Sequence, residues 1–466
     1  MRRQRPLIAT TASTVATRGV THGIGSSLNL DLCQGATEVI DRLRYVNPKV
    51  IDNVTLEYNL MSELVFDQDW MAIFQAMGSL PMVHTVSLSF RVPVPIPVQA
   101  FAELIRLSAT SALVTLHLNG LQLSTAIVQT SFTTVTTTSS TSSSFEVDPM
   151  ETLLHAFQRH TSLQTVHICR YRPIRRAATQ QMSDEKWKEN FIVDPLCRAI
   201  FRLPKVSTLY LEKTDIFSDP NLLHSICQGS YTTLKLGDQE RGFVLDRYIP
   251  FMAASLESNQ KLHEVRVHHP LEGKAVVAAA FHLLERNASL TTLFLRIQSN
   301  DFGAFLGAGL QQNTTLQTLE LDLMVDRRHV RKNLESMVLC WGKNHDTAVS
   351  KLKLDARGIR SAALLQDPFA KMLKEDNFVL RRLMINRDTM PLKQDLLFFL
   401  KLNQMERNYF LRRQPEMNEE NDGSSSKSSR GKKDIREKWI HLLIQNKSDV
   451  RVLHYFISRN PWVLPI

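Results

Sequence analysis

The stretch of sequence that decides the fold is residues 289–321, which read SLTTLFLRIQSNDFGAFLGAGLQQNTTLQTLEL. At its two ends, residues 290–295 and 316–321, apolar side chains recur at positions i, i+3 and i+5, and the last two alternate as in a strand with one buried face. Between these ends the apolar spacing is that of a helix. One strand and one helix are too small to bury their own apolar faces, so the unit must stack on copies of itself.

The same apolar phrase recurs along most of the chain. It occurs eleven times, and successive copies are 25 to 33 residues apart except for two gaps of 50 and 43 residues. Single matches arise by chance, but eleven in near-regular order predict a repeat array. The copies are Ile51/Val54/Leu56, Val83/Val86/Leu88, Leu113/Leu116/Leu118, Leu163/Val166/Ile168, Val206/Leu209/Leu211, Tyr231/Leu234/Leu236, Leu262/Val265/Val267, Leu290/Leu293/Leu295, Leu316/Leu319/Leu321, Val349/Leu352/Leu354 and Leu380/Leu383/Ile385.

The pattern resembles leucine-rich repeats of the ribonuclease-inhibitor-like class. The lead-ins at residues 285–290 (ERNASL) and 311–316 (QQNTTL) match that class closely. The resemblance implies an α/β horseshoe with a concave parallel β-sheet and convex helices. The Asn or Cys that the class places three residues after the last strand leucine survives only at Asn59, so we expect irregular repeat geometry. Among the other repeats, this position holds Thr214, Gln298, Met324, Arg357 and Asp388.

Shifts in composition divide the chain. Residues 1–35 are basic and rich in Ser and Thr, which is typical of disorder or of an organelle transit peptide. Two insertions lengthen the two wide gaps between repeats, and the first is almost entirely Ser and Thr. The expected parts are a disordered segment at 1–35, the array at 36–390 with disordered insertions near 124–148 and 170–190, a helical cap at 391–413, a flexible linker at 414–433 and a C-terminal helical segment at 434–466.

The C-terminal tail also resembles that of uncharacterised repeat proteins of single-celled algae. It differs from them at Glu406, where most such tails have glycine, and in its longer linker. The resemblance suggests a lineage and implies no activity. The matching residues are Leu402-Asn403 with Arg407, Trp439 with Leu442, and Arg459-Asn460-Pro461.

Composition indicates the cellular compartment of the protein. No apolar run is long enough for a transmembrane helix, and no apolar core follows Arg5 as a secretory signal would require. The five cysteines are dispersed, which suits a reducing compartment. We therefore expect a cytoplasmic protein without membrane contact, with the nucleus or an organelle as alternatives.

We find no motif that predicts catalysis. A phosphate-binding G-x-x-x-x-G-K-[ST] loop is absent, and Gly23-Ile-Gly25 lacks the third glycine of a dinucleotide site. His268 and His269 are adjacent, and adjacent residues of a strand point to opposite faces, which argues against joint metal binding. We expect no enzyme activity, cofactor or metal.

A basic and aromatic insertion follows Ile168. Guanidinium groups interleaved with rings can bind phosphates and stack on bases, although a solvated loop has the same composition. The nucleic-acid candidates are Arg170, Tyr171, Arg172, Arg175, Arg176 and Trp187.

The concave face is the other candidate surface. In each strand, the residue between the last two apolar positions points away from the core, as do the residues just before and after that pair. The three rows together hold six Lys or Arg and six Asp or Glu, so the face is close to neutral overall. Aromatic and Arg anchors on a mixed surface are typical of protein binding. The candidates are Tyr210, Lys235, Arg266, Phe294, Glu320, Lys353 and Met384.

These observations favour a non-catalytic scaffold that recognises an unidentified protein. The alternative is a nucleic-acid-associated protein that uses the basic loops and tail, supported by the net charge of +10. A third hypothesis, regulation of a GTPase as in the Ran GTPase-activating relatives of this repeat class, lacks the acidic tail typical of those proteins. Periodicity does not predict the oligomeric state or the partner.

Overall fold

A computed structural model gives the fold of most of the chain. The parts that it describes are residues 26–58, 67–124, 149–171, 196, 200, 203, 205–214, 220–237, 249–344, 346–356, 359, 361–375, 379–386, 391–405, 441, 444 and 449–459. The predicted insertions, the predicted linker and residues 1–25 lie outside the described residues for all or most of their length.

The strands form one parallel sheet in sequence order, which confirms the predicted α/β solenoid. Each strand pairs with the next in parallel, because each connection returns the chain to the same end of the sheet. The strands are β1 (Ser26–Asp31), β2 (Ile51–Tyr58), β3 (Thr85–Pro97), β4 (Thr115–Ser124), β5 (Thr165–Cys169), β6 (Thr208–Glu212), β7 (Thr233–Leu236), β8 (Glu264–Leu271), β9 (Thr292–Ile297), β10 (Thr318–Leu323), β11 (Lys351–Ala356) and β12 (Arg382–Ile385).

The sheet has one strand more than the eleven predicted from the apolar phrase. Strand β1 lies within the segment that we expected to be disordered, and that expectation is wrong for residues 26–35. Leu28 and Leu30 pair with Val54 and Leu56 of β2, so β1 carries the last two apolar positions of the phrase. Its first position would fall on Gly25, and the missing apolar residue concealed this copy.

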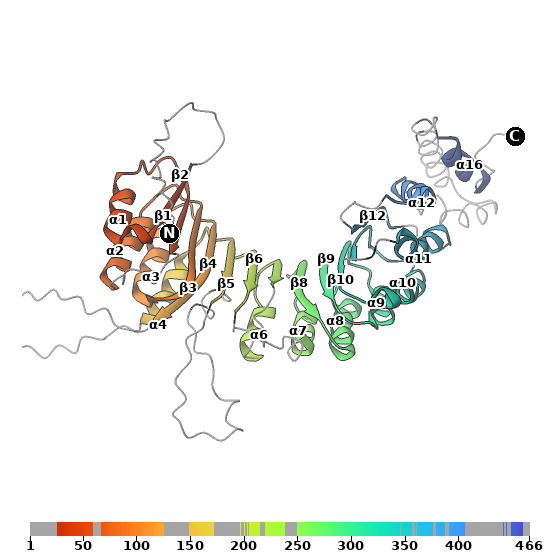
Figure 1. The fold of residues 1–466 in the computed structure, drawn as a ribbon, viewed down its shortest axis with the longest axis horizontal. Helices are drawn as coiled ribbons and strands as arrows, with labels where there is room; N and C mark the ends of the chain where they lie inside the picture. Colours follow the sequence, from red (N-terminus) through yellow and green to blue (C-terminus); the bar gives the residue numbers. More distant parts are fainter. Residues whose placement is uncertain are drawn as a thin grey trace, which may run out of the picture.

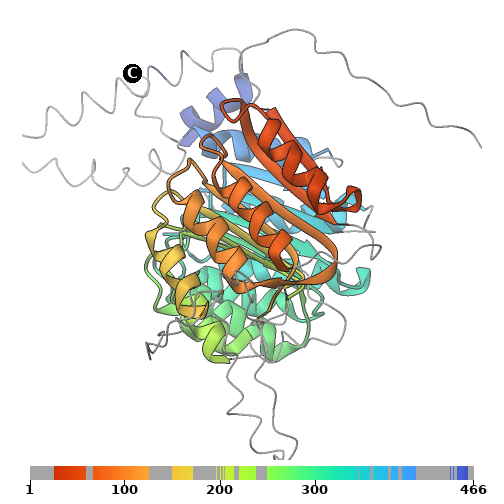
Figure 2. The same cartoon turned by 90° about the vertical axis from the view of Figure 1, so that its left-hand side faces the viewer.

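Helices cover the outer side of the arc and strands line the inner side (Figure 1). Successive helices also pack on one another, and α1, α2 and α3 stand side by side in Figure 2. The helices are α1 (Ala36–Tyr45), α2 (Asp67–Gly78), α3 (Val98–Ser108), α4 (Pro149–Arg159), α6 (Pro220–Cys227), α7 (Ile249–Glu257), α8 (Lys274–Arg286), α9 (Phe302–Gln312), α10 (Arg327–Trp341), α11 (Ala362–Glu375), α12 (Gln394–Gln404) and α16 (Val450–Arg459), with a short 3-10 turn, η1 (Leu32–Gln34), after β1.

The core lies between the sheet and the helices. Alternate residues of each strand are buried there, as in β9, where Leu293, Leu295 and Ile297 are buried and the residues between them are half-exposed. In the N-terminal repeats the core is rich in aromatic rings. The centroids of Trp70 and Phe90 are 5.8 Å apart at 87°, a favourable edge-to-face arrangement.

Buried asparagines that follow helices α7, α8 and α9 tie each of these repeats to the one before it. Asn287 donates from Nδ2 to the carbonyl of Leu256 at 2.7 Å, and its Oδ1 accepts from the backbone N–H groups of Ser289 and Leu290. Asn259 and Asn313 make the same contacts one repeat earlier and later. Asn259, Asn287 and Asn313 thus form an asparagine ladder of buried hydrogen bonds between successive repeats.

Pairing is irregular at three places, within β1–β2, β3–β4 and β8–β9, in keeping with the predicted irregular geometry. Thr214 occupies the position three residues after the last strand leucine, where the repeat class has Asn or Cys, and it makes a hydrogen bond there. Its side chain is buried, and its hydroxyl donates to the carbonyl of Tyr171 at 3.2 Å.

Helices α12 and α16 end the solenoid. Leu402, Val452 and Phe456 form a small separate core between them, and Lys401 Nζ lies 2.6 Å from Asp449 Oδ2. Asn403 donates to the carbonyl of Leu380, which ties α12 to the last repeat. Such a cap covers the apolar end that a solenoid would otherwise expose.

Candidate functional site

The predicted central row of the concave face is a continuous line across the sheet. Its seven candidates occupy matching positions on successive strands β6 to β12. All are half-buried except Glu320, which is 7% exposed. Because strands hold their side chains on a shared framework, the row presents one fixed pattern to a ligand. The row is Tyr210, Lys235, Arg266, Phe294, Glu320, Lys353 and Met384.

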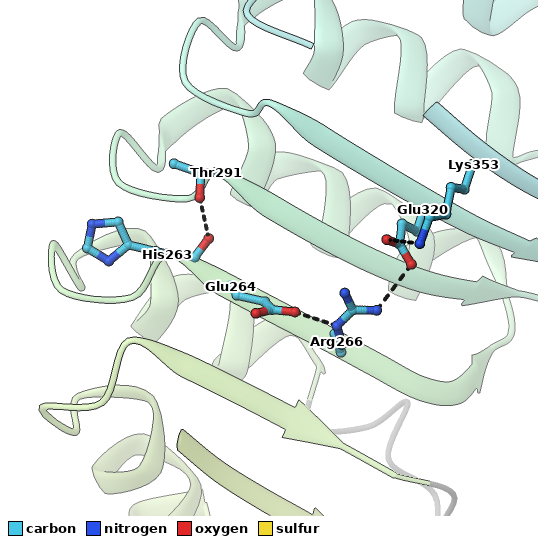
Figure 3. Close-up of polar contacts among 6 residues, drawn as sticks. All are labelled: His263, Glu264, Arg266, Thr291, Glu320 and Lys353. Atoms are coloured by element: carbon cyan, nitrogen blue, oxygen red, sulfur yellow. Dashed lines mark hydrogen bonds and ion pairs between the residues drawn. The ribbon is translucent and has the colours of Figure 1, made fainter. Parts of the chain in front are cut away.

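Four of the charged residues form one network (Figure 3). Arg266 donates from Nε to Glu264 and from Nη1 to Glu320 Oε2 at 3.1 Å, and Lys353 Nζ donates to Glu320 Oε1 at 2.7 Å. Burial raises the pKa of Glu320, but its hydrogen bonds and ion pairs with Lys353 and Arg266 outweigh burial and lower the pKa overall. The carboxylate of Glu320 therefore stays ionised and holds both cations in place.

Phe294 is held beside this network. The guanidinium carbon of Arg266 lies 6.0 Å from the centroid of its ring, and the ring of His268 lies 4.5 Å away at 35°. The ring is thus fixed by a cation and a second ring while remaining half-exposed. Such a side chain can receive an apolar group without first losing conformational freedom.

A histidine–tyrosine cluster lies at the other end of the row. His117 and His167 face each other with their Nδ1 atoms 3.2 Å apart, and Tyr210 stacks on His167 at 4.2 Å and 18°. The hydroxyl of Tyr210 donates to Glu212 at 3.1 Å. Burial, reinforced by His117 and Lys235 and opposed by Glu212, lowers the pKa of His167 to about 4.

Burial also lowers the pKa of His117 below its usual value, so both imidazoles are neutral at pH 7 and one Nδ1 donates to the other. Both histidines occupy the same strand position as Tyr210, on β4 and β5, and neither was selected as a candidate from the sequence. The signal that reveals the cluster is three ring residues at the same phrase position in successive repeats.

The structure corrects part of the nucleic-acid hypothesis. Tyr171 is 1% exposed, so its ring is not available to stack on a base. Arg170 donates to Asn119 Oδ1 at 2.9 Å and to the carbonyl of Arg91 at 3.4 Å. Its positive φ of 49° turns the chain after β5 and carries Tyr171 inward. The other four candidates, Arg172, Arg175, Arg176 and Trp187, lie outside the described residues.

Other kinds of site are not found in the described part of the chain. It contains no group of three or more His, Cys, Asp or Glu side chains placed to hold a metal. His268 and His269 fall in the irregular stretch of β8, and both are half-buried. Within the same residues, no helix combines the length and the apolar character needed to cross a bilayer.

Known proteins offer no further guide to the site. Neither the models of known protein families nor the curated proteins give a match to this sequence. The architecture is that of a repeat protein, in which strands and helices alternate around one parallel sheet.

Proposed function

We propose that this protein is a non-catalytic recognition scaffold that binds a partner protein on its concave face. The observation that carries the proposal is the in-register row from Tyr210 to Met384, whose side chains are held by strands and exposed in part. Aromatic and Arg side chains held in this way supply most of the free energy of typical protein–protein interfaces.

We also propose that the units are leucine-rich repeats of the ribonuclease-inhibitor-like class. In support, the asparagines of the lead-ins at 285–290 and 311–316 are the buried ladder residues Asn287 and Asn313. The proposed algal lineage of the tail is supported less directly. Leu402 and Asn403, which match that tail, are both buried in the cap.

Charge pairing favours a protein over a nucleic acid as the partner of this face. Two of its six cations, Arg266 and Lys353, are neutralised by Glu264 and Glu320, and Arg296 pairs with Asp322 at 2.9 Å. Phosphate recognition needs a concentrated track of free cations. The nucleic-acid alternative therefore depends on the basic loops and tail.

The experiment is an affinity pull-down from native cell extract treated with nuclease, read by mass spectrometry. The test variant combines Tyr210→Ala, Arg266→Ala and Phe294→Ala. A matched variant combines Tyr45→Ala, Arg331→Ala and Leu339→Ala, which removes the same kinds of side chain from exposed helix positions. Circular dichroism checks that both variants fold.

Proteins retained by wild type and by the matched variant, and lost by the test variant, are the expected result. Equal retention by all three baits would contradict binding by the concave face. Should no bait retain a protein, and omission of the nuclease bring down nucleic acid with every bait, the nucleic-acid function replaces the one proposed.

We place this function inside the cell, in the cytoplasm. Cys33, Cys169, Cys227 and Cys340, the four cysteines among the described residues, carry free thiols. Burial raises the pKa of the Cys227 thiol well above its usual value, so this group stays protonated and unreactive. Free buried thiols are typical of proteins in reducing compartments.

A further inference from the structure

The near-neutral concave face is divided into two halves of opposite charge. In the three rows of β1–β6 there are three carboxylates, Asp31, Glu57 and Glu212, and no Lys or Arg. The same rows of β7–β12 hold six Lys or Arg against four Asp or Glu. The concave face is therefore close to neutral as a whole, but its β7–β12 half is positive.

Three cations of that half have no ion pair with any described residue. Lys235 lies in the central row of β7, where it is half-buried. Lys351 and Arg382 lie side by side in the preceding row of β11 and β12, where their positions pair directly. By contrast, the nearby Arg266, Arg296 and Lys353 are each held by a carboxylate. The unpaired cations thus form two poles, Lys235 at one and Lys351 with Arg382 at the other.

The separation of the poles fits a short extended chain. Neighbouring strands are about 4.8 Å apart, so four strand spacings separate Lys235 from Lys351 by about 19 Å. An extended peptide advances about 3.3 Å per residue and covers that distance in about six residues. Phe294 lies between the poles, and such a chain would cross its half-exposed apolar ring.

We propose that the concave surface of β7–β12 binds an extended acidic segment of a partner protein, which lies across the strands. Its carboxylates contact Lys235 at one end and Lys351 with Arg382 at the other, and an apolar side chain between them packs on Phe294. This inference rests on the proposed function and gives the chemical class of the partner.

The carboxylates of the surface explain why a peptide fits better than a nucleic acid. Glu320 and Asp322 lie between the two poles on β10. A nucleic acid carries a charge on every phosphate and would place some of them against these carboxylates. A peptide with acidic residues only at its ends avoids that repulsion, and like-charge repulsion of this kind is a strong source of specificity.

The inference is tested by selecting binders from a display library of random peptides about twelve residues long, twice the span of the site. The baits are the full-length protein and a variant that combines Lys235→Gln, Lys351→Gln and Arg382→Gln. A control variant combines Lys332→Gln, Lys343→Gln and Lys374→Gln on the exposed helix face. Circular dichroism confirms the fold of each bait.

Wild type and the control variant are expected to select peptides with Asp or Glu at two sites about six residues apart and an apolar residue between them. Fluorescence anisotropy of the best peptide should show binding at least tenfold weaker to the concave variant, because three charge contacts are lost. Its affinity for wild type should fall as salt rises.

Two results would overturn the inference. Selection of neutral or basic peptides, or of the same peptides by the concave variant, would contradict an acidic partner segment. The proposed function would still hold if the pull-down succeeds. Failure to select any peptide, with binding of an oligo(dT) probe to wild type and not to the concave variant, would instead assign these cations to nucleic acid.

Discussion

The N-terminal repeats, β1–β6, and the C-terminal repeats, β7–β12, build the same arc by different means. The first group fills its core with large rings, including Trp70, Phe90 and Phe101, whereas the second joins its helices and strands with Asn259, Asn287 and Asn313. The concave face changes in parallel, from acidic and histidine-rich to a surface with a network of paired charges and three unpaired cations. The second group also buries rings, among them Phe281 and Trp341, so its buried hydrogen bonds add to apolar packing and do not replace it.

The position three residues before each strand phrase shows the change most directly. In the repeats of β8, β9 and β10 it holds Asn259, Asn287 and Asn313, and in that of β5 it holds His160, which is also buried. Nδ1 of His160 accepts from the N–H of Leu163 at 3.2 Å, the role that Asn287 Oδ1 plays for Leu290. The imidazole of His160 takes the place of the asparagine amide and, unlike the amide, can be protonated.

The largest effect is expected from removing a ring of the N-terminal core. Trp70→Ala leaves a cavity beside Phe74 and Phe90 and should lower the free energy of unfolding by about 4 kcal/mol. Denaturant unfolding measures the loss, and hydrogen exchange should show it confined to β1–β6, since repeats contact only their neighbours. Equal loss of protection in β9–β12 would show that the two groups of repeats unfold together and contradict a local effect of Trp70.

Breaking the asparagine ladder should have the next largest effect. Asn287→Ala leaves the Leu256 carbonyl without that donor and the N–H groups of Ser289 and Leu290 without that acceptor, at a cost of about 3 kcal/mol. The matched control is Asn53→Ala, which removes one exposed hydrogen bond to Ser27 and should change stability little. Similar denaturation midpoints for both variants would contradict a structural role of the ladder.

The difference between His160 and the ladder asparagines should appear as pH dependence. Burial lowers the pKa of His160 from its ordinary 6.5 to about 4, so between these values only the unfolded chain takes up the proton. The free energy of unfolding should therefore fall as pH falls from 6.5 toward 4, with full stability above 6.5. At pH 5 the shifted pKa of His160 should lower the free energy of unfolding by roughly 2 kcal/mol relative to its value above pH 6.5.

His160→Asn supplies the amide of the other repeats and should remove that part of the pH dependence. Denaturation midpoints of wild type and variant at pH 7.5 and pH 5 give the measurement. His167, whose pKa is also lowered to about 4, keeps its own contribution in both proteins. An unchanged pH profile would show that His160 does not couple folding to protonation.

The smallest effect is expected from the ion network of the C-terminal repeats. Glu320→Gln removes the charge that holds Arg266 and Lys353 and should cost about 1 kcal/mol, because these cations retain partial solvation. Denaturation in low and in high salt separates the charge effect, since the difference from wild type should shrink as salt rises. A loss that is independent of salt would indicate packing as its cause.

Much of the fold could be predicted from spacing alone. The phrase located eleven of the twelve strands that the structure describes, because burial on one face of a strand forces alternation along the sequence. It missed β1, where the first apolar position is Gly25, and it did not reveal the ladder. A ladder asparagine binds carbonyl groups of the preceding repeat, some 30 residues away, so no local pattern records the contact.

The candidate site was predicted less completely. The central row was identified because matching phrase positions align when repeats stack. Tyr171 was assigned to an exposed loop, but a single turn at Arg170 buries it. A second basic cluster, formed by Arg327, Arg328, Arg331 and Lys332, occupies the first turns of α10 on the helix side, away from the row.

The sequence by itself determined the repeat, the parallel sheet and the row of residues that faces the arc, because periodic burial leaves a periodic record in the chain. Only the tertiary structure decided which charges of that row are paired. Glu320 neutralises Arg266 and Lys353 across strands while Lys235 stays unpaired, although the three cations carry the same charge in the sequence. Pairing depends on distances between side chains of different repeats, and those distances exist only after the repeats have stacked.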